Sequence, residues 1–284
     1  MGVITSCNVA TAITKLVAAD VLPALMSNLV MGNLVSRDYE PTVAQVGDRI
    51  AVPMPSLGEA RIELSARAEA NFLVPDITKV LAVPDLLALY MQPAVVALAE
   101  KIETDLLALY SQFTVNRVLG EAAKPIVAAD IEDADTTMFQ AKVPASQPKY
   151  LVVDANSYSA VRQIPRFSEY GTASEAGLRS LVDGSVGKIR NFFVFRSQFV
   201  AKTGSSPTST HNLAFTRSAI CMVIRRLPQP LPGSGVISEY SELGNFGMQV
   251  TMECRPNMLA QQFTIAALYG CGVLHPEYGV ELTT

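Results

Sequence analysis

The longest periodic pattern of apolar residues in the chain lies between residues 84 and 119. Charged and polar residues cluster at 100–105 and mark its wetter side. Apolar side chains recur at steps of three and four residues, the spacing that lines one face of an α-helix: Leu87, Tyr90, Met91, Ala94, Leu98, Ile102, Leu106, Leu109 and Phe113.

Pro93 falls inside this pattern, where proline removes a backbone donor but suits the first turn of a helix. We therefore predict a short lead-in at 85–91 and a main helix from about Pro93 to about Arg117. About 24 residues at 1.5 Å per residue span roughly 36 Å. A rod of that length can support the elements packed on it, although the periodicity fits an ordinary core helix equally well.

Two differently patterned segments precede this helix. Residues 8–31 carry apolar side chains at helical spacing with few polar ones between, so this arm must lie on its own chain or on a neighbour. Residues 37–83 are rich in β-branched residues, and they predict two or three long strands, whose prolines restrict the first to an edge or an isolated ribbon. Alternation there places Glu59, Arg61 and Glu63 on one face. A two-stranded ribbon is marginal alone in water, so we expect either an arm supported by a partner chain or an ordinary hairpin with a solvated face.

The region after the long helix mixes helices and strands. Asp130 is a candidate N-cap for a helix at about 131–142. An apolar run then predicts a buried strand at 149–154, a helix follows at 156–164, and a further strand is expected at 188–199. This order predicts an α/β region.

The last third of the chain is read as mainly β-structure. A polar, low-complexity tip at 201–212, expected to be mobile, precedes one or two strands. A linker rich in proline and glycine at 227–235 marks a boundary. Beyond it, Met248, Val250 and Met252 alternate with polar residues, as in a half-buried antiparallel strand.

Composition narrows the class of protein. The chain has 284 residues, 49% of them hydrophobic and 17% charged. This length predicts two sub-domains or an elongated shape, and the apolar excess indicates large contacts between subunits. A net charge of −4 provides no overall basic field for nucleic acid. Four scattered cysteines without CxxC spacing fit buried, reduced thiols in a cytosol-like compartment, and neither a signal peptide nor a membrane span is predicted.

Motifs for catalysis, cofactors or metals fail on inspection. The stretch 183–189 lacks the first glycine and the hydroxyl of a phosphate loop. The acidic run at 130–135 lacks the glycine and the glutamate of a calcium loop, so it is better explained as a charged first helical turn. His211 and His275 are the only histidines and are read as surface or packing residues. We therefore predict no enzyme, no cofactor and no metal site.

The order of the predicted segments resembles the major capsid protein of tailed bacteriophages, which has the Hong Kong 97-type fold. VGDRIAVPMPSLGEARIEL followed by LYMQPAVVALAEKIETDLL is similar to the extended loop of that family leading into its spine helix. KYLVVDANSYSAVRQIPRF, then GKIRNFFVFRSQ and LAFTRSAI, form a second match. LYGCGVLHPEYGVEL is similar to the final strands of its peripheral domain, and together the matches cover about 37–284.

The resemblance implies an α+β shell subunit with four parts. These would be an N-terminal helical arm (1–36), an extended β loop (37–83) across a neighbouring subunit, a peripheral domain (spine helix 84–119 with a C-terminal sheet, 236–284) and an axial domain (120–235). Pentamers and hexamers of the chain would build an icosahedral virion capsid, made in the host cytoplasm, around double-stranded DNA on its inner face. A separate scaffolding protein and a portal are possible partners, and no membrane is involved.

The resemblance also directs attention to charged residues of the extended loop. Five of them are candidates for pairing across subunits: Glu59, Arg61, Glu63, Arg67 and Glu69. Some members of the family bond a lysine of this loop to an asparagine of a neighbour. This chain has no lysine between Lys15 and Lys79, and Lys79 lies at the base of the loop, so we expect no such cross-link. The chain begins almost directly with the arm, which predicts no fused scaffolding segment.

Two other functions stay open from the sequence. An encapsulin-type compartment shell would share the fold but hold enzyme cargo, and its cargo-peptide groove is not located here. A soluble α/β enzyme is disfavoured by the failed motif search and by the scarcity of histidine.

Overall fold

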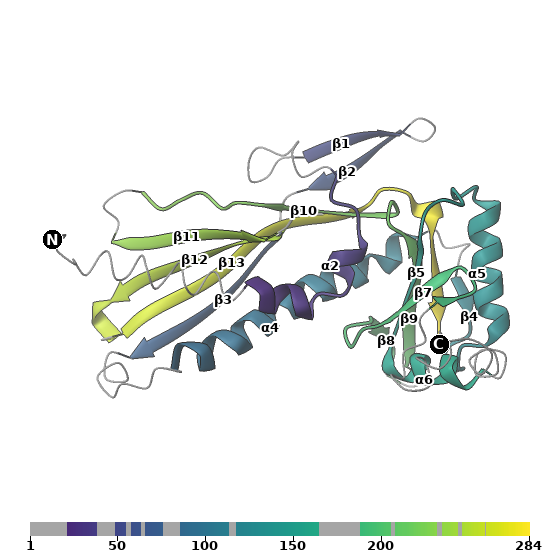
Figure 1. The fold of residues 1–284 in the computed structure, drawn as a ribbon, viewed down its shortest axis with the longest axis horizontal. Helices are drawn as coiled ribbons and strands as arrows, with labels where there is room; N and C mark the ends of the chain where they lie inside the picture. The colour runs from purple at the N-terminus through teal and green to yellow at the C-terminus, as the bar shows by residue number, and fades with distance from the viewer. Residues whose placement is uncertain are drawn as a thin grey trace.

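A computed structural model describes residues 22–38, 49–54, 58–63, 66–75, 86–113, 118–164, 188–205, 208–231, 235–243, 246–258 and 260–284. These residues form an elongated molecule with two lobes (Figure 1). In the first lobe, long strands lie beside a long helix. In the second, a sheet packs with two further helices. A two-stranded ribbon projects near the junction.

The helices and strands follow one another along the chain, with residues 22–28 helical ahead of the first labelled element. In order they are α2 (Met31–Leu34), β1 (Arg49–Met54), β2 (Gly58–Glu63), β3 (Ala66–Pro75), α4 (Leu86–Leu107), η2 (Ala108–Gln112), β4 (Val118–Gly120), α5 (Ala128–Gln140), β5 (Lys149–Val153), α6 (Ala155–Gln163), β6 (Lys188–Ile189), β7 (Phe192–Arg196), β8 (Lys202–Thr203), β9 (Ser209–Thr216), β10 (Ile220–Arg225), β11 (Val236–Leu243), β12 (Phe246–Arg255), η4 (Pro256–Met258), β13 (Ala260–Val273), η5 (Pro276–Tyr278) and β14 (Gly279–Thr283).

The sheet of the first lobe is organised around β13. Its strand order is β10-β13-β12-β11, with β3 also paired to β13. The β3 pairing is antiparallel and runs from Ala260 opposite Pro75 to Tyr269 opposite Ala66. Because β13 has hydrogen-bonded neighbours on both sides, its long apolar sequence is buried as a central strand. Helix α4 contacts β3 and β13 and lies alongside this sheet (Figure 1).

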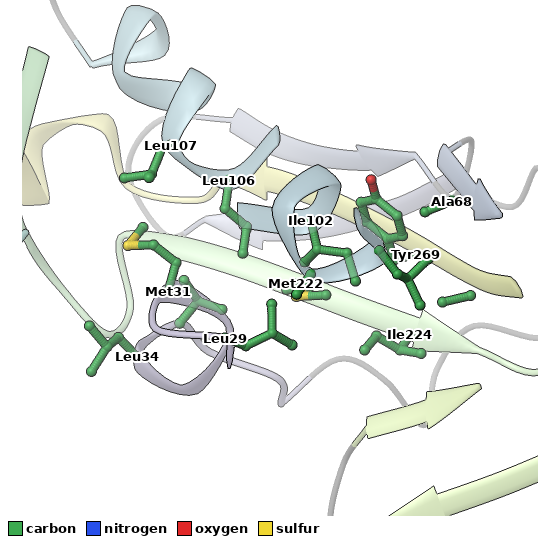
Figure 2. Close-up of a cluster of buried hydrophobic side chains, with 14 of the residues drawn as sticks. Leu29, Met31, Leu34, Ala68, Ile102, Leu106, Leu107, Met222, Ile224 and Tyr269 are labelled. Carbon is green, nitrogen blue, oxygen red and sulfur yellow. The ribbon is translucent and has the colours of Figure 1, made fainter. Parts of the chain in front are cut away.

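The helical face predicted from the sequence forms the main core. Ile102 and Leu106 of α4 are fully buried and pack with Met31, with Met222 of β10 and with Tyr269 of β13. Figure 2 shows these side chains converging from the four segments. Each fully buried side chain of this size contributes about 1.5–3 kcal/mol relative to exposure. The 3.6-residue period therefore decides which face of α4 is buried.

The second lobe contains a mixed sheet of order β4-β14-β9-β5-β7-β6, with β8 paired to β9. The β4–β14 and β5–β7 pairs are parallel, and the others are antiparallel. Alternation along β5 serves two cores: Leu151 and Val153 pack with α5 and α6, whereas Val152 belongs to the core of the first lobe. Since one sheet faces both clusters, the lobes share a continuous packed interior.

The described chain also joins the lobes through contacts at the end of the long helix. Phe113, which follows η2, is buried, and its ring lies against Gly279 at the start of β14. A Cβ added to Gly279 would lie 2.7 Å from Cζ of that ring and closer still to Cε1 and Cδ1. Glycine is therefore required for this close approach, whereas a side chain would displace the ring.

A buried asparagine holds the second lobe together at the start of α6. Asn212 of β9 is 0% exposed. Its Oδ1 accepts the backbone N–H of Asp154 at 2.9 Å, and its Nδ2 donates to the carbonyl of Leu282 at 3.2 Å. The same Nδ2 lies 3.2 Å from Ser157 Oγ and 3.1 Å from Thr284 Oγ1. One amide thus connects three segments that are distant in sequence.

The long helix differs from its predicted boundaries. Helix α4 begins at Leu86 and contains Pro93, so the predicted start at Pro93 is wrong. The proline removes one hydrogen bond, to the carbonyl of Leu89 in regular helical geometry. Packing along the sheet overrides that loss, as tertiary context commonly does. The α-helical part ends at Leu107, and after η2 the backbone is extended at Phe113, short of the predicted end near Arg117.

Other expectations are confirmed or corrected at single residues. The strand predicted at 149–154 is confirmed as β5. Helix α5 begins at Ala128, before the predicted start near residue 131. Asp130 is not its N-cap but lies inside the first turn, where its Oδ2 accepts the N–H of Val127 at 2.9 Å. Helix α6 begins at Ala155, one residue before the predicted start at 156, and Asp154 precedes it. The tip predicted at 201–212 contains β8 and the start of β9, with residues 206–207 outside the described chain.

Three strands lie in a different sheet from the one that the predicted domain boundaries imply. Strand β10 lies in the first-lobe sheet, although its residues were assigned to the axial region 120–235. Strand β14 lies in the second-lobe sheet, although it was assigned to the C-terminal sheet 236–284. Strand β3 belongs to the first-lobe sheet instead of the extended loop 37–83. Sequence alternation indicates a strand but carries no information on its distant partner, which explains these differences.

Candidate functional site

The ribbon of β1 and β2 stands apart from the two larger sheets of the described structure. Its two strands pair antiparallel with each other and form a separate two-stranded sheet. Arg49 lies opposite Glu63, and Arg61 lies opposite Ala51. Strand β2 contacts β13 near the junction of the lobes, and the ribbon extends away from the first-lobe sheet (Figure 1). This is the isolated ribbon that the prolines predicted.

The structure separates the five candidate contact residues into two groups. Glu59, Arg61 and Glu63 belong to β2 of the ribbon. Arg67 and Glu69 belong to β3, where Arg67 Nη2 and Glu69 Oε2 lie 2.7 Å apart and both side chains are exposed. Arg67 and Glu69 thus already have partners within their own chain. The exposed pair contributes about 0–1 kcal/mol.

Helix α4 is fixed to the sheet by a polar contact at the edge of the core. The hydroxyl of Tyr269 donates to Asp105 Oδ2 at 2.5 Å, and Lys101 Nζ lies 2.7 Å from Asp105 Oδ1. Burial, with Asp105 beside it, raises the pKa of Tyr269, so the phenol remains a donor. Burial likewise raises the pKa of Cys271 to about 11, which keeps this thiol protonated and unreactive.

The segment before the ribbon is anchored to α4 by a buried carboxyl group. Glu103 is 0% exposed, and its Oε1 accepts the backbone N–H of Met31 at 2.7 Å and that of Gly32 at 3.4 Å. Burial raises the pKa of Glu103 to about 7, and the backbone N–H groups only partly oppose this rise. The sequence pattern missed this residue because Glu103 sits in a charged run on the side predicted to be wet.

The sequence also did not predict the contacts that His211 makes at the junction of the lobes. His211 Nδ1 lies 2.5 Å from Glu281 Oε1, and His211 Nε2 lies 2.6 Å from Thr203 Oγ1. The ring of Tyr110 in η2 stacks on the imidazole with centroids 4.2 Å apart. Thr283 Oγ1 also donates to Glu281 Oε1, at 3.1 Å. These contacts connect the end of the long helix to β8, β9 and β14. They could not be predicted because their residues lie far apart in the sequence.

Chemistry beyond these contacts is sparse in the residues that the structure describes. His275 stacks on Tyr278, as expected of a packing histidine. Within the part of the chain that the structure describes, Cys221, Cys254 and Cys271 form no disulfide. Within the described ranges, no three His, Cys, Asp or Glu side chains gather in a way that could hold a metal ion. Of the helices in those same ranges, none combines the length and apolar character needed to cross a membrane.

Solved structures are similar to this fold. A structure titled Mycobacterium phage Che8 matches with a TM-score of 0.64 and 18% identity over 89% of this chain and 90% of that chain. The capsid of Ralstonia phage GP4 matches with a TM-score of 0.55 and 13% identity over 88% and 86%. An encapsulin complex from Synechococcus elongatus matches with a TM-score of 0.55 and 11% identity over 92% and 87%. At these identities the likeness concerns the fold, and it bears out the α+β capsid fold expected from the sequence.

The sequence comparisons assign the family. No curated protein sequence matches the chain. A family model described as phage capsid protein matches residues 76–222, which is more than half of the sequence and includes the long helix and most of the second lobe. The chain therefore belongs to the phage capsid protein family and is a structural capsid subunit.

Proposed function

We propose that copies of this chain form the icosahedral head of a tailed phage. Pentamers and hexamers would close around double-stranded DNA, with assembly in the host cytoplasm and the finished subunit in the virion. Membership of the phage capsid family is the observation that carries this proposal. A separate scaffolding protein and a portal would be the further partners, and the subunit itself would have no enzymatic role.

Each part of the subunit receives a role in this proposal. The β1–β2 ribbon would reach over a neighbouring subunit, because a two-stranded ribbon is marginally stable alone. The second lobe, with α5 and α6, would gather around the five- and six-fold axes. The first-lobe sheet and α4 would form the peripheral part between axes. In these roles β10 would be peripheral and β14 axial, because β10 lies in the first-lobe sheet and β14 in the second-lobe sheet.

An encapsulin-type shell is the second candidate function, supported by the fold similarity to the Synechococcus complex. Negative-stain microscopy of the purified protein tests both, since either shell gives closed particles. Small discrete oligomers would instead indicate a soluble enzyme. Nuclease-protected double-stranded DNA in particles recovered from the cells that naturally make them supports the phage head. Protein cargo without DNA would support the compartment.

Reversing the charge of Arg61 tests the role of the ribbon. We expect Arg61→Glu to lower particle yield several-fold, because the same contact recurs around the shell even though each exposed pair contributes only about 0–1 kcal/mol. The free energy of unfolding of the unassembled subunit should change by less than about 0.5 kcal/mol. Particle yield is measured by sedimentation, and unfolding by urea titration.

The matched control for this variant is Arg217→Glu, a charge reversal at an exposed turn between β9 and β10. It should leave particle yield unchanged. Equal yields of the Arg61→Glu variant and the wild type would contradict the role given to the ribbon. Arg67→Glu is expected to have a smaller effect than Arg61→Glu, since Arg67 already pairs with Glu69 within the chain.

Assembled shells are expected to lack covalent cross-links between subunits. No lysine occurs between Lys15 and Lys79, which removes the amine that such a bond would need in the ribbon. Denaturing electrophoresis of mature particles should therefore give one band at the subunit mass of 30.5 kDa. A ladder of higher multiples would refute this expectation.

A further inference from the structure

The carboxyl group of Glu103 is buried without a charged partner. Its Oε1 accepts two backbone N–H groups at the start of α2, whereas its Oε2 has no hydrogen-bond partner. Its neighbours are apolar: Met31, whose backbone it binds, and Ile102 and Leu106 of α4 are all buried in the main core. A carboxylate enclosed in this way loses its hydration without gaining an ion pair.

Among the described residues, no titratable side chain on the elements around Glu103 is hydrogen-bonded to its carboxyl group. Arg37 Nη2 donates to the carbonyl of Gly32 at 3.1 Å. On α4, Lys101 and Asp105 pair with each other, and Asp105 also binds Tyr269. The remaining described groups on the arm and on β3, β10 and β13 are Asp38, Arg67, Glu69, Cys221, Arg225 and Cys271. Burial and the backbone N–H groups of residues 30–32 set the pKa of Glu103, and none of these side chains contributes.

We propose that Glu103 is a protonation-dependent anchor that holds residues 22–34 on α4 when the carboxyl group is neutral and loosens them when it ionises. A neutral carboxyl group keeps Oε1 as the acceptor for Met31 and Gly32 and removes the buried charge. Ionisation creates a buried negative charge, and because Oε2 has no partner among the described residues, water must solvate it. Opening of the segment admits that water.

The opening is confined to a defined segment. Ser36 forms a bridge with Cys221: its N–H donates to the carbonyl of Ile220 at 3.0 Å, and its carbonyl accepts the N–H of Met222 at 2.9 Å. This bridge holds the chain immediately after α2. The apolar side chains ahead of it, Leu22, Leu25, Leu29, Met31 and Leu34, are the ones that opening would expose.

The direction of the pH dependence follows from the raised pKa. In the anchored state the pKa of Glu103 is about 7, above its ordinary value of 4.5. Anchoring is therefore strongest below the ordinary value, weakens as the pH rises through the interval between the two, and is weakest above about pH 7. Acid closes this contact, and mildly alkaline conditions open it.

Hydrogen exchange of the full-length, unassembled subunit tests this anchor. Between pH 5.5 and pH 8, after correction for intrinsic exchange rates, the protection of the Met31 and Gly32 amides should fall on the order of 10- to 30-fold. Amides of β5 in the second lobe serve as the internal reference. Equal protection at the two pH values would overturn the proposal.

Two variants and one spectroscopic measurement make the test specific. Glu103→Gln keeps the acceptor oxygen without the charge, so protection should be independent of pH and at least as high as that of the wild type at pH 5.5. Glu100→Gln, an exposed position on the same helix, should retain the pH dependence of the wild type. A pH dependence that survives in Glu103→Gln would refute the role of Glu103. Carbon-13 titration of the Glu103 carboxyl in the wild type decides the matter if that variant fails to fold: a midpoint near 7 supports the anchor, and one near 4.5 excludes it.

Discussion

Replacing Gly279 by alanine is expected to lower the free energy of unfolding of the unassembled subunit by about 2–3 kcal/mol. The added Cβ would overlap the buried ring of Phe113, which is confined between the end of η2 and the start of β14. The ring cannot move outward without opening the junction between the lobes. Urea unfolding measures the loss.

A double-mutant cycle separates this overlap from a backbone effect. In a Phe113→Leu background the ring atoms that meet the new Cβ are absent, so Gly279→Ala should cost less than about 1 kcal/mol there. Gly235→Ala provides a second comparison, because no atom lies within 4 Å of its Cβ position and only its φ of +73° opposes a side chain. An equal cost of Gly279→Ala in both backgrounds would show that Phe113 is not the cause.

Replacing Asn212 by alanine is expected to destabilise the subunit by about 2–3 kcal/mol, because it leaves the buried N–H of Asp154 without an acceptor and removes the other bonds of the amide. The N–H of Asp154 loses its acceptor, whereas the carbonyl of Leu282 loses the side-chain donor but stays paired with Asn212 in the β9–β14 ladder. Asn212→Asp should be at least as costly, since it keeps the shape but places a carboxylate oxygen against the Leu282 carbonyl. The free energy of unfolding in urea gives both values.

Asn191 supplies the matched control for this prediction. Its Nδ2 also donates a side-chain hydrogen bond, to Asp135 Oδ2 at 3.1 Å, but the site is exposed. Asn191→Ala should therefore change the free energy of unfolding by less than about 0.5 kcal/mol. A cost below about 1 kcal/mol for Asn212→Ala would mean that water replaces its bonds, contrary to the buried network described above.

The local pattern of hydrophobic residues predicted individual helices and strands more accurately than it predicted which strands pair with each other. The apolar period of α4 and the alternation of Met248, Val250 and Met252 in β12 depend on nearest neighbours in the sequence. The three apolar side chains of β12 are buried as expected, although Gln249 between them is buried too. The assignment of β10 and β14 to sheets depends on pairings between distant residues. Those pairings leave no mark in the hydrophobic pattern of either strand.

The residues with the most specific contacts were the hardest to predict. Glu103 and Asn212 are buried because distant backbone groups need partners, not because of their own hydrophobicity. His211 is predicted as a surface or packing residue, and only the fold brings it to Glu281 and Tyr110. The ribbon was predictable because its prolines restrict its pairing. Its contacts with a neighbouring subunit remain a prediction.

The position of β13 at the centre of the first-lobe sheet has a consequence for synthesis on the ribosome. The strands that flank it, β3, β10 and β12, all leave the ribosome before β13 does. Strand β14, which pairs with both β4 and β9, emerges later still. Neither lobe can therefore complete its sheet while the nascent chain is still growing through β13 and β14.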